Sequence, residues 1–191
     1  KRCVIELGYG EKISLKGVEY WVGGNGANVA VGMQRLGIPA LLVAEIGNGL
    51  VADEARRQLD AEGLNMSLVT QSDGVVAGLG IVINYQAERT ILSYYPPSRP
   101  EFPAHLEGTE WAYLTSIGEN FEDYCMKALS WMRSNKVKLA FNPGGRQIRE
   151  GKEWLGPFLR QTEVLLVNRE EAARILEDEE NYPVGDVKKL L

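Results

Sequence analysis

Several residue types on which common enzyme classes depend are rare in this sequence. Its 191 residues contain one histidine, His105, and two cysteines, Cys3 and Cys125, which are far apart and lack CxxC spacing. The sequence therefore indicates neither a disulfide framework nor a cysteine-based zinc site. A catalytic triad built on histidine is not expected either, because His105 lies in a proline-rich loop, where a solvated side chain is the simpler interpretation.

Long apolar runs and basic clusters are also lacking. No apolar run is long enough to cross a membrane, and the first residues do not have the pattern of a signal peptide. The formal net charge is −5, and no basic cluster offsets the acidic residues. This charge balance argues against nucleic acid or an anionic membrane surface as a partner. We therefore expect a cytoplasmic protein that acts on small molecules.

The chain has an ordinary globular composition, with 45% hydrophobic and 25% charged residues, and we expect one domain over residues 1–191. Apolar runs and amphipathic stretches alternate along it. They predict strands at 41–46, 111–115, 137–141 and 164–167, and helices at 51–62, 121–133, 154–159 and 169–177. Strands that alternate with helices predict an α/β fold with a parallel sheet covered on both faces.

Further β-structure is expected outside this alternating pattern. Residues 75–83 and 90–94 are rich in β-branched and aromatic residues and flank a polar turn at 84–89, which predicts a hairpin. Residues 3–7 and 18–22 also look like short strands and are joined through glycines. They predict a small antiparallel element.

The most informative stretch is the sequence GGNGANVAVGMQRLG at residues 23–37. Ala27, Ala30, Val31 and Leu36 are spaced as on one packed face of a helix, so the glycines before them lie at a helix N-terminus. Glycine lets the backbone turn sharply and approach a ligand closely. The first N–H groups of a helix lack partners within it and attract polar oxygens or phosphates.

Two other interpretations of this stretch follow from the residues alone. A dinucleotide-binding GxGxxG motif would need a glycine at position 29, following Gly24 and Gly26. Val29 stands there instead, so the motif is incomplete. Residues 18–22 also look half exposed, whereas a dinucleotide fold requires a buried strand there. A Rossmann-type dehydrogenase is therefore a remote alternative. The other alternative is a glycine turn that caps an ordinary core helix.

The stretch resembles the sugar-binding signature of the ribokinase-like, or PfkB, carbohydrate kinases, in which two glycines, a variable residue, Gly, Ala and Asn begin a helix that ends in Leu-Gly. The resemblance continues through residues 41–69 and, more weakly, to Asn168 and Glu171. It implies a three-layer αβα sandwich that is incomplete at both ends of this chain. A small β lid, formed from about residues 1–22 and 75–95, belongs to the same implied fold.

The resemblance also implies how a sugar is bound. Gly24 and Asn28 fall on positions that hold the sugar, and Asn25 stands where a lysine is more familiar. The amide of Asn28 can donate and accept at once, as a pair of sugar hydroxyls requires. A local hydrogen bond at the helix start is an alternative role for it. Glu119 is a candidate sugar contact, offset by one residue from the family position.

Asn168 and Glu171 form an Asn-x-x-Glu sequence at a strand-to-helix junction. From the spacing alone, a capping box, in which Glu171 reaches back to Asn168, is the simplest interpretation. The resemblance implies that the pair orders Mg²⁺, water and the phosphates of ATP, with Glu171 as a metal ligand, a role that suits a carboxylate. Asn142 and Arg146 lie in a turn that either meets a phosphate or a substrate carboxylate or is a solvated surface turn.

By this resemblance the complete protein would transfer the γ-phosphoryl group of ATP to a sugar hydroxyl, with Mg²⁺ as cofactor. The Gly-Ala-Gly-Asp motif that supplies the family's catalytic base is not found in residues 1–191. We therefore assign no catalytic residue and expect these residues alone to be inactive. A nucleoside kinase of the same fold and a non-catalytic sugar- or nucleotide-binding module are the alternatives. Pairing of lid edges between subunits would give a homodimer.

Overall fold

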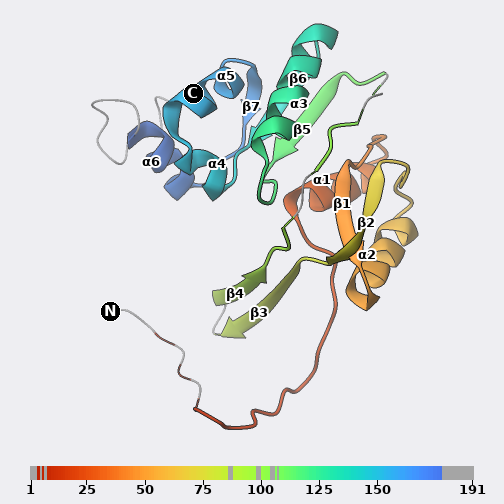
Figure 1. Cartoon of the computed structure of the whole chain (residues 1–191), viewed down its shortest axis with the longest axis vertical. Helices are drawn as coiled ribbons and strands as arrows, with labels where there is room; N and C mark the ends of the chain where they lie inside the picture. Colours follow the sequence, from red (N-terminus) through yellow and green to blue (C-terminus); the bar gives the residue numbers. More distant parts are fainter. Residues whose placement is uncertain are drawn as a thin grey trace.

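A computed structural model describes residues 8–85, 88–97, 100–103 and 108–177, together with residues 4, 6 and 106. It contains two parallel sheets and an antiparallel hairpin (Figure 1). The strands are β1 (Ala44–Asn48), β2 (Val69–Val76), β3 (Leu79–Tyr85), β4 (Glu88–Tyr94), β5 (Trp111–Thr115), β6 (Lys138–Asn142) and β7 (Thr162–Leu165). The helices are α1 (Asn25–Arg35), α2 (Leu50–Ala61), α3 (Glu122–Asn135), α4 (Gly145–Arg149), α5 (Gly151–Leu159) and α6 (Arg169–Glu177).

The glycine-rich stretch begins α1, as predicted. Gly24 precedes the helix with a φ of 97°, a left-handed conformation that favours glycine. Ala30 is buried, and Ala27 and Val31 pack beside it against the core of the β1–β2 layer. Leu36 is 76% exposed, because α1 has already ended at Arg35. Its predicted place on the packed face is therefore wrong.

The β1–β2 layer is a parallel strand pair with α2 as the connection between the strands. Gly49 precedes α2 with a φ of 99°, and Gly63 follows it with a φ of 74°, so Gly63 supplies the predicted left-handed cap. The layer has its own small core, formed by Ala30, Leu42, Leu59, Leu64 and Val69. Burial of these side chains is what holds α1 against the strands.

The second parallel sheet has its strands in the order β5-β6-β7. Aromatic side chains dominate its core: Phe141 and Phe158 are fully buried with ring centroids 5.6 Å apart, and Trp154 stacks on Phe158 at 4.6 Å. Lys136 ends α3 in a left-handed conformation, and the N–H of Val137 then donates to the carbonyl of Met132. The chain turns directly from α3 into β6.

Most predicted elements are confirmed. β5 and α6 have the predicted bounds, and β6 and β7 are shifted by one or two residues. The turn after β6 differs, because it continues into the short helix α4. The side chain of Gln147 accepts the N–H of Gly144 over 2.7 Å and fixes this first turn. The α/β class is correct, but the described residues divide the predicted single parallel sheet between two separate sheets.

The predicted hairpin is confirmed as β3 and β4, which pair along seven residues each. It projects away from both parallel sheets (Figure 1). β3 begins at Leu79, later than predicted, because Val75 and Val76 belong to β2. Its strands expose apolar side chains such as Ile81 and Val82 on the two opposite faces of the hairpin.

The strand predicted at residues 18–22 is not formed. Tyr20 and Trp21 are 62% and 81% exposed, so the alternating side chains bury no face. The N–H of Val22 donates to the side chain of Gln58 on α2 over 2.9 Å. In a strand, this N–H would instead donate to the backbone of a neighbouring strand. Residues 3, 5 and 7 of the other predicted piece, and His105, lie outside the described residues. No helix in the described ranges combines the length and apolar character needed to cross a membrane.

Candidate functional site

A hydrogen-bonded polar cluster lies where β5 and β6 end beside the start of α1. The side-chain nitrogen of Asn25 donates to Asn142 Oδ1 over 3.0 Å and to Thr115 Oγ1 over 3.3 Å. The hydroxyls of Tyr113 and Thr115 donate to the same Asn142 oxygen over 3.0 and 3.2 Å. Four polar side chains from three elements therefore meet at the carboxyl end of a parallel sheet, where ligands bind in α/β proteins.

Strand register explains this meeting. Thr115 and Asn142 are the last residues of β5 and β6 and lie directly opposite each other. The following turns are also packed tightly, since a Cβ on Gly144 would lie 2.5 Å from the Cβ of Ser116. Glycine at 144 lets the turn after β6 approach the loop after β5. Gln147, which is fully buried, donates to the carbonyl of Thr115 over 3.4 Å and fixes the same approach.

The start of α1 exposes the other residues predicted to hold a sugar. Gly24, Asn25 and Asn28 are exposed, and the N–H of Asn28 donates to the carbonyl of Gly24 over 2.9 Å as the first bond of the helix. Among the residues that the structure describes, no side chain caps α1, so its first N–H groups are available to oxygen atoms of a ligand. The structure brings Asn25 into the polar cluster and leaves the side chain of Asn28 on the open surface.

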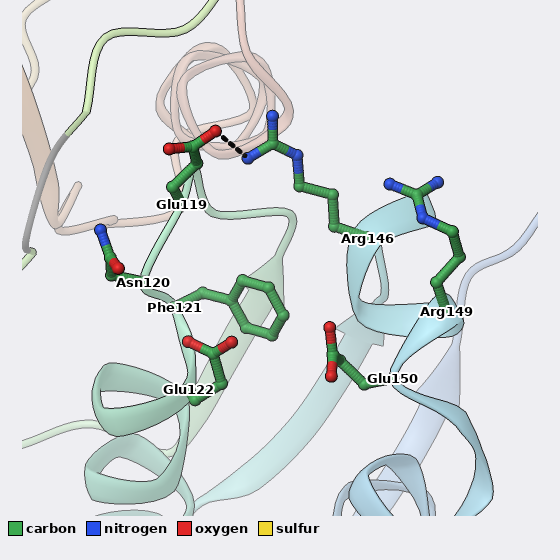
Figure 2. A pocket seen from close by; sticks show the side chains of 7 residues that line it. All are labelled: Glu119, Asn120, Phe121, Glu122, Arg146, Arg149 and Glu150. Carbon is green, nitrogen blue, oxygen red and sulfur yellow. Dashed lines mark ion pairs between the residues drawn. The ribbon is translucent and has the colours of Figure 1, made fainter.

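Glu119 and Arg146 form an ion pair at the edge of an open cleft of about 300 Å³ (Figure 2). Arg146 Nη1 lies 3.2 Å from Glu119 Oε1, and the guanidinium lies over the ring of Tyr95, 5.8 Å from its centroid. Seven residues line the cleft: Glu119, Asn120, Phe121, Glu122, Arg146, Arg149 and Glu150. Among these seven residues, three carboxylates outnumber two guanidinium groups, so the lining has no excess of positive charge.

Asn168 and Glu171 form the predicted capping box at the start of α6. The N–H of Asn168 donates to Glu171 Oε2 over 3.0 Å, and the N–H of Glu171 donates to Asn168 Oδ1 over 2.9 Å. The described residues contain no group of three or more His, Cys, Asp or Glu side chains that could enclose a metal ion. A half-exposed carboxylate such as Glu171 nevertheless fits Mg²⁺, which keeps most of its waters and takes few protein ligands.

Asn142 links the cluster to this capping box. Its side-chain nitrogen donates to the carbonyl of Leu166 over 2.6 Å, two residues before Asn168. The predicted sugar side and the predicted phosphate side are therefore connected through one side chain. The Mg²⁺ and phosphate roles of Asn168, Glu171 and Arg146 stay predictions.

Sequence reasoning missed Tyr113, Thr115 and Gln147. Tyr113 and Thr115 lie in the predicted strand 111–115, and the rule that ligands lie beyond strand ends could have drawn attention to Thr115. No sequence pattern pointed to Gln147, because its burial depends on packing against Cys125. The side-chain N–H of Gln147 donates to the sulfur of Cys125 over 3.6 Å. Burial raises the pKa of the Cys125 thiol to about 12, so this thiol is a core group and not a nucleophile.

Comparison with known proteins identifies the family and the fold. The family model of the pfkB family carbohydrate kinases matches residues 2–191. The uncharacterized sugar kinase YegV of Escherichia coli K12 is 34% identical over 82 residues, which are 43% of this chain and 25% of that protein. This chain therefore spans about a quarter of the curated relative that it matches.

Solved structures give the same fold at low sequence identity. The nucleoside kinase of Methanocaldococcus jannaschii matches with a TM-score of 0.75 and 20% identity, over 94% of this chain and 60% of that one. The ribokinase of Cryptococcus neoformans var. grubii, solved in complex with ADP, matches with a TM-score of 0.69 and 20% identity, over 94% and 56%. The predicted ribokinase-like fold is confirmed. The chain belongs to the pfkB family of carbohydrate kinases.

Proposed function

We propose that the complete protein transfers the γ-phosphoryl group of ATP to a hydroxyl group of a sugar. Membership of a kinase family supports this reaction. The observation that carries the proposal is the continuous contact from Asn25 through Asn142 to the carbonyl of Leu166. It joins an exposed polar surface suited to hydroxyl groups to the helix start that carries Asn168 and Glu171.

On the acceptor side, Gly24, Asn25, Asn28 and Glu119 bind the sugar. The backbone N–H groups at the start of α1 donate to sugar oxygens, and the amide of Asn28 donates to one hydroxyl and accepts from another. Glu119 accepts from a hydroxyl while Arg146 holds it in place through their ion pair. These groups orient the acceptor, and orientation supplies much of the catalysis in phosphoryl transfer.

On the nucleotide side, Asn168 and Glu171 receive Mg²⁺ and its waters, and Arg146 and the turn that begins at Asn142 contact a phosphate. Bound Mg²⁺ would neutralise the charge that develops on the phosphate oxygens. Glu171 already uses one oxygen to cap α6, which restrains its carboxylate while the cap leaves the other oxygen unused. Nucleotide binding by the relative from Cryptococcus, solved in complex with ADP, supports this role.

The β3–β4 hairpin is proposed as part of a lid that closes over the sugar and excludes water, together with residues 1–22. Tyr95 follows β4 and contacts Arg146, so hairpin movement would reach the cleft directly. Exposed apolar side chains on both hairpin faces favour pairing of two lids in a homodimer. We further propose that the protein acts in the cytoplasm.

The test is an ADP-release assay of the full-length protein with Mg²⁺, ATP and separate panels of sugars and nucleosides. We expect ADP release that depends on a sugar. Release that depends on a nucleoside would make the protein a nucleoside kinase, and sugar binding without ATP-dependent phosphorylation would make it a binding module. We also expect a purified fragment of residues 1–191 to show no turnover.

A further inference from the structure

Neighbouring groups hold the side-chain amides of Asn25 and Asn142 in one orientation, and the consequence for the acceptor rests on the proposed sugar kinase function. We propose that Asn25 presents its amide oxygen to the acceptor and that this oxygen makes the site selective for an uncharged sugar hydroxyl over an anionic group. Each amide orientation is fixed by its neighbour, in three steps that begin at a backbone carbonyl.

The first step fixes Asn142. The carbonyl oxygen of Leu166 can only accept a hydrogen bond, and it lies 2.6 Å from the side chain of Asn142. The atom of Asn142 that faces it must therefore be the NH₂ nitrogen. The opposite orientation would place two carbonyl oxygens in contact with no hydrogen between them.

The second step fixes what surrounds the oxygen of Asn142. With its nitrogen directed at Leu166, Asn142 directs Oδ1 at the hydroxyls of Tyr113 and Thr115, which lie 3.0 and 3.2 Å away and donate to it. Asn25 is the third neighbour of this oxygen, at 3.0 Å. Only the NH₂ group of Asn25 can make a favourable contact there.

The third step concerns the remaining atom of Asn25. Its nitrogen lies within hydrogen-bond distance of both Asn142 Oδ1 and Thr115 Oγ1, so the NH₂ group is directed into the cluster. Its oxygen therefore faces away from the cluster, on an exposed residue at the start of α1. Within the described part of the chain, no donor contacts this oxygen. Asn25 therefore presents its amide oxygen, a hydrogen-bond acceptor, to a ligand, while its NH₂ group is held by the cluster.

A hydroxyl group can donate to this oxygen, whereas a carboxylate or phosphate at the same place would meet oxygen with oxygen. The N–H groups at the start of α1 do not discriminate, because they donate to hydroxyl and anionic oxygens alike. On the acceptor side, the Glu119 carboxylate that is paired with Arg146 also disfavours an anionic group on the sugar. Asn25 is therefore the specificity-determining residue at this position, and Asn142 is the positioning residue behind it.

The amide orientation can be tested without any ligand, through Asn25→Asp and the matched Asn28→Asp. The helix dipole alone would make an aspartate stabilising near the start of α1. We expect Asn25→Asp to lower the midpoint of urea unfolding at pH 7.5, because a carboxylate would face the oxygen of Asn142. Repulsion raises the pKa of that carboxyl, so protonation should recover the midpoint as the pH falls toward 5. Asn28→Asp should leave the midpoint unchanged or raise it.

A midpoint for Asn25→Asp equal to or above that of the unsubstituted protein at pH 7.5 would overturn the assigned orientation. Selectivity is tested by calorimetric titration of the full-length protein with D-glucose against D-glucuronate and D-galactose against D-galacturonate. We expect each neutral sugar to bind at least tenfold more tightly than its acid. Asn25→Lys should reduce this ratio at least tenfold, and Asn135→Lys, an exposed control on α3, should leave it unchanged.

The proposed selectivity would be overturned if the acids bound as tightly as the neutral sugars or more tightly. It would also be overturned if none of the four sugars bound. If the neutral sugars bind as expected but ATP phosphorylates none of them, the proposed kinase function fails while the assignment of Asn25 stands. The two proposals are thus contradicted by different results.

Discussion

Asn168 and Glu171 bind each other reciprocally across the first turn of α6, with backbone-to-side-chain hydrogen bonds of 3.0 and 2.9 Å. The same two side chains that begin the helix are those proposed to meet Mg²⁺ and phosphate. Their structural and functional roles can be separated, because the cap needs only an oxygen acceptor whereas the metal needs a negative charge.

Glu171→Gln should therefore keep the cap and lose the metal. Its amide oxygen can still accept the N–H of Asn168, so we expect the free energy of unfolding to change by less than about 0.5 kcal/mol. The Mg²⁺ affinity of the full-length enzyme should fall by about tenfold or more. Asn168→Ala removes the cap itself and should cost about 1 kcal/mol. Urea unfolding and the Mg²⁺ dependence of ADP release measure the two effects. A loss of stability without a change in Mg²⁺ dependence for Glu171→Gln would leave the pair with a capping role only.

Gly144→Ala tests the close approach of the two turns beside the polar cluster. A Cβ at this position would lie 2.5 Å from the Cβ of Ser116, so the turn after β6 must move. We expect a loss of about 1–3 kcal/mol in the free energy of unfolding. Gly32→Ala is the matched control, because its Cβ would meet no atom within 4 Å. In the interior of α1 it should stabilise the protein by about 0.5–1 kcal/mol. Equal effects of the two substitutions would contradict the packing described for Gly144.

The ion pair between Glu119 and Arg146 should matter more for binding than for stability. The two side chains are 52% and 39% exposed, and exposed pairs contribute about 0.2–1 kcal/mol. A double-mutant cycle with Glu119→Gln and Arg146→Met should give a coupling energy in this range that decreases with salt. Glu119→Ala, which removes the acceptor, should raise the KM for the sugar about tenfold, as expected for loss of a hydrogen bond to a charged group. An unchanged KM would remove Glu119 from the acceptor site.

The buried thiol of Cys125 makes stability depend on alkaline pH. Burial raises its pKa from 9.0 to about 12, and burial likewise raises the pKa of Tyr124 from 10.0 to about 12. The unfolded chain loses these protons first, so it binds fewer protons than the folded chain above pH 9. Stability should therefore fall as the pH rises from 9 toward 12.

Urea unfolding between pH 7.5 and 11 measures this dependence. Cys125→Ala and Tyr124→Phe should each make the alkaline decrease less steep. In the native protein at pH 8, Cys125 should react with a thiol reagent only as fast as the protein unfolds. Rapid modification of Cys125 in folded protein, distinguished from that of Cys3 by peptide mass mapping, would contradict the burial of this residue.

Local sequence signals were sufficient for most of the elements. The glycines at 24 and 63 indicated where α1 begins and where α2 ends, because left-handed conformations there favour glycine. The spacing of Asn168 and Glu171 in the Asn-x-x-Glu sequence was sufficient to predict the capping box, and the structure confirms it. Residues 18–22 were predicted incorrectly, because alternation alone does not supply a partner strand.

The polar cluster was only partly predictable. Asn25 and Asn142 were candidates individually, but they are 117 residues apart in sequence, and no local pattern indicates that they touch. Their contact depends on where packing places α1 relative to β5 and β6. Tyr113 and Thr115 resembled ordinary strand residues for the same reason, since only the tertiary arrangement directs their hydroxyls to Asn142.

We propose that the complete protein phosphorylates a sugar through the connected Asn25, Asn142 and Asn168–Glu171 groups. The most direct test is ³¹P NMR of the full-length protein incubated with Mg²⁺, ATP and neutral sugars. We expect ADP and a new sugar phosphate resonance, both lost or greatly reduced in Glu171→Gln. ATP and a sugar that both bind without forming a sugar phosphate would contradict this proposal.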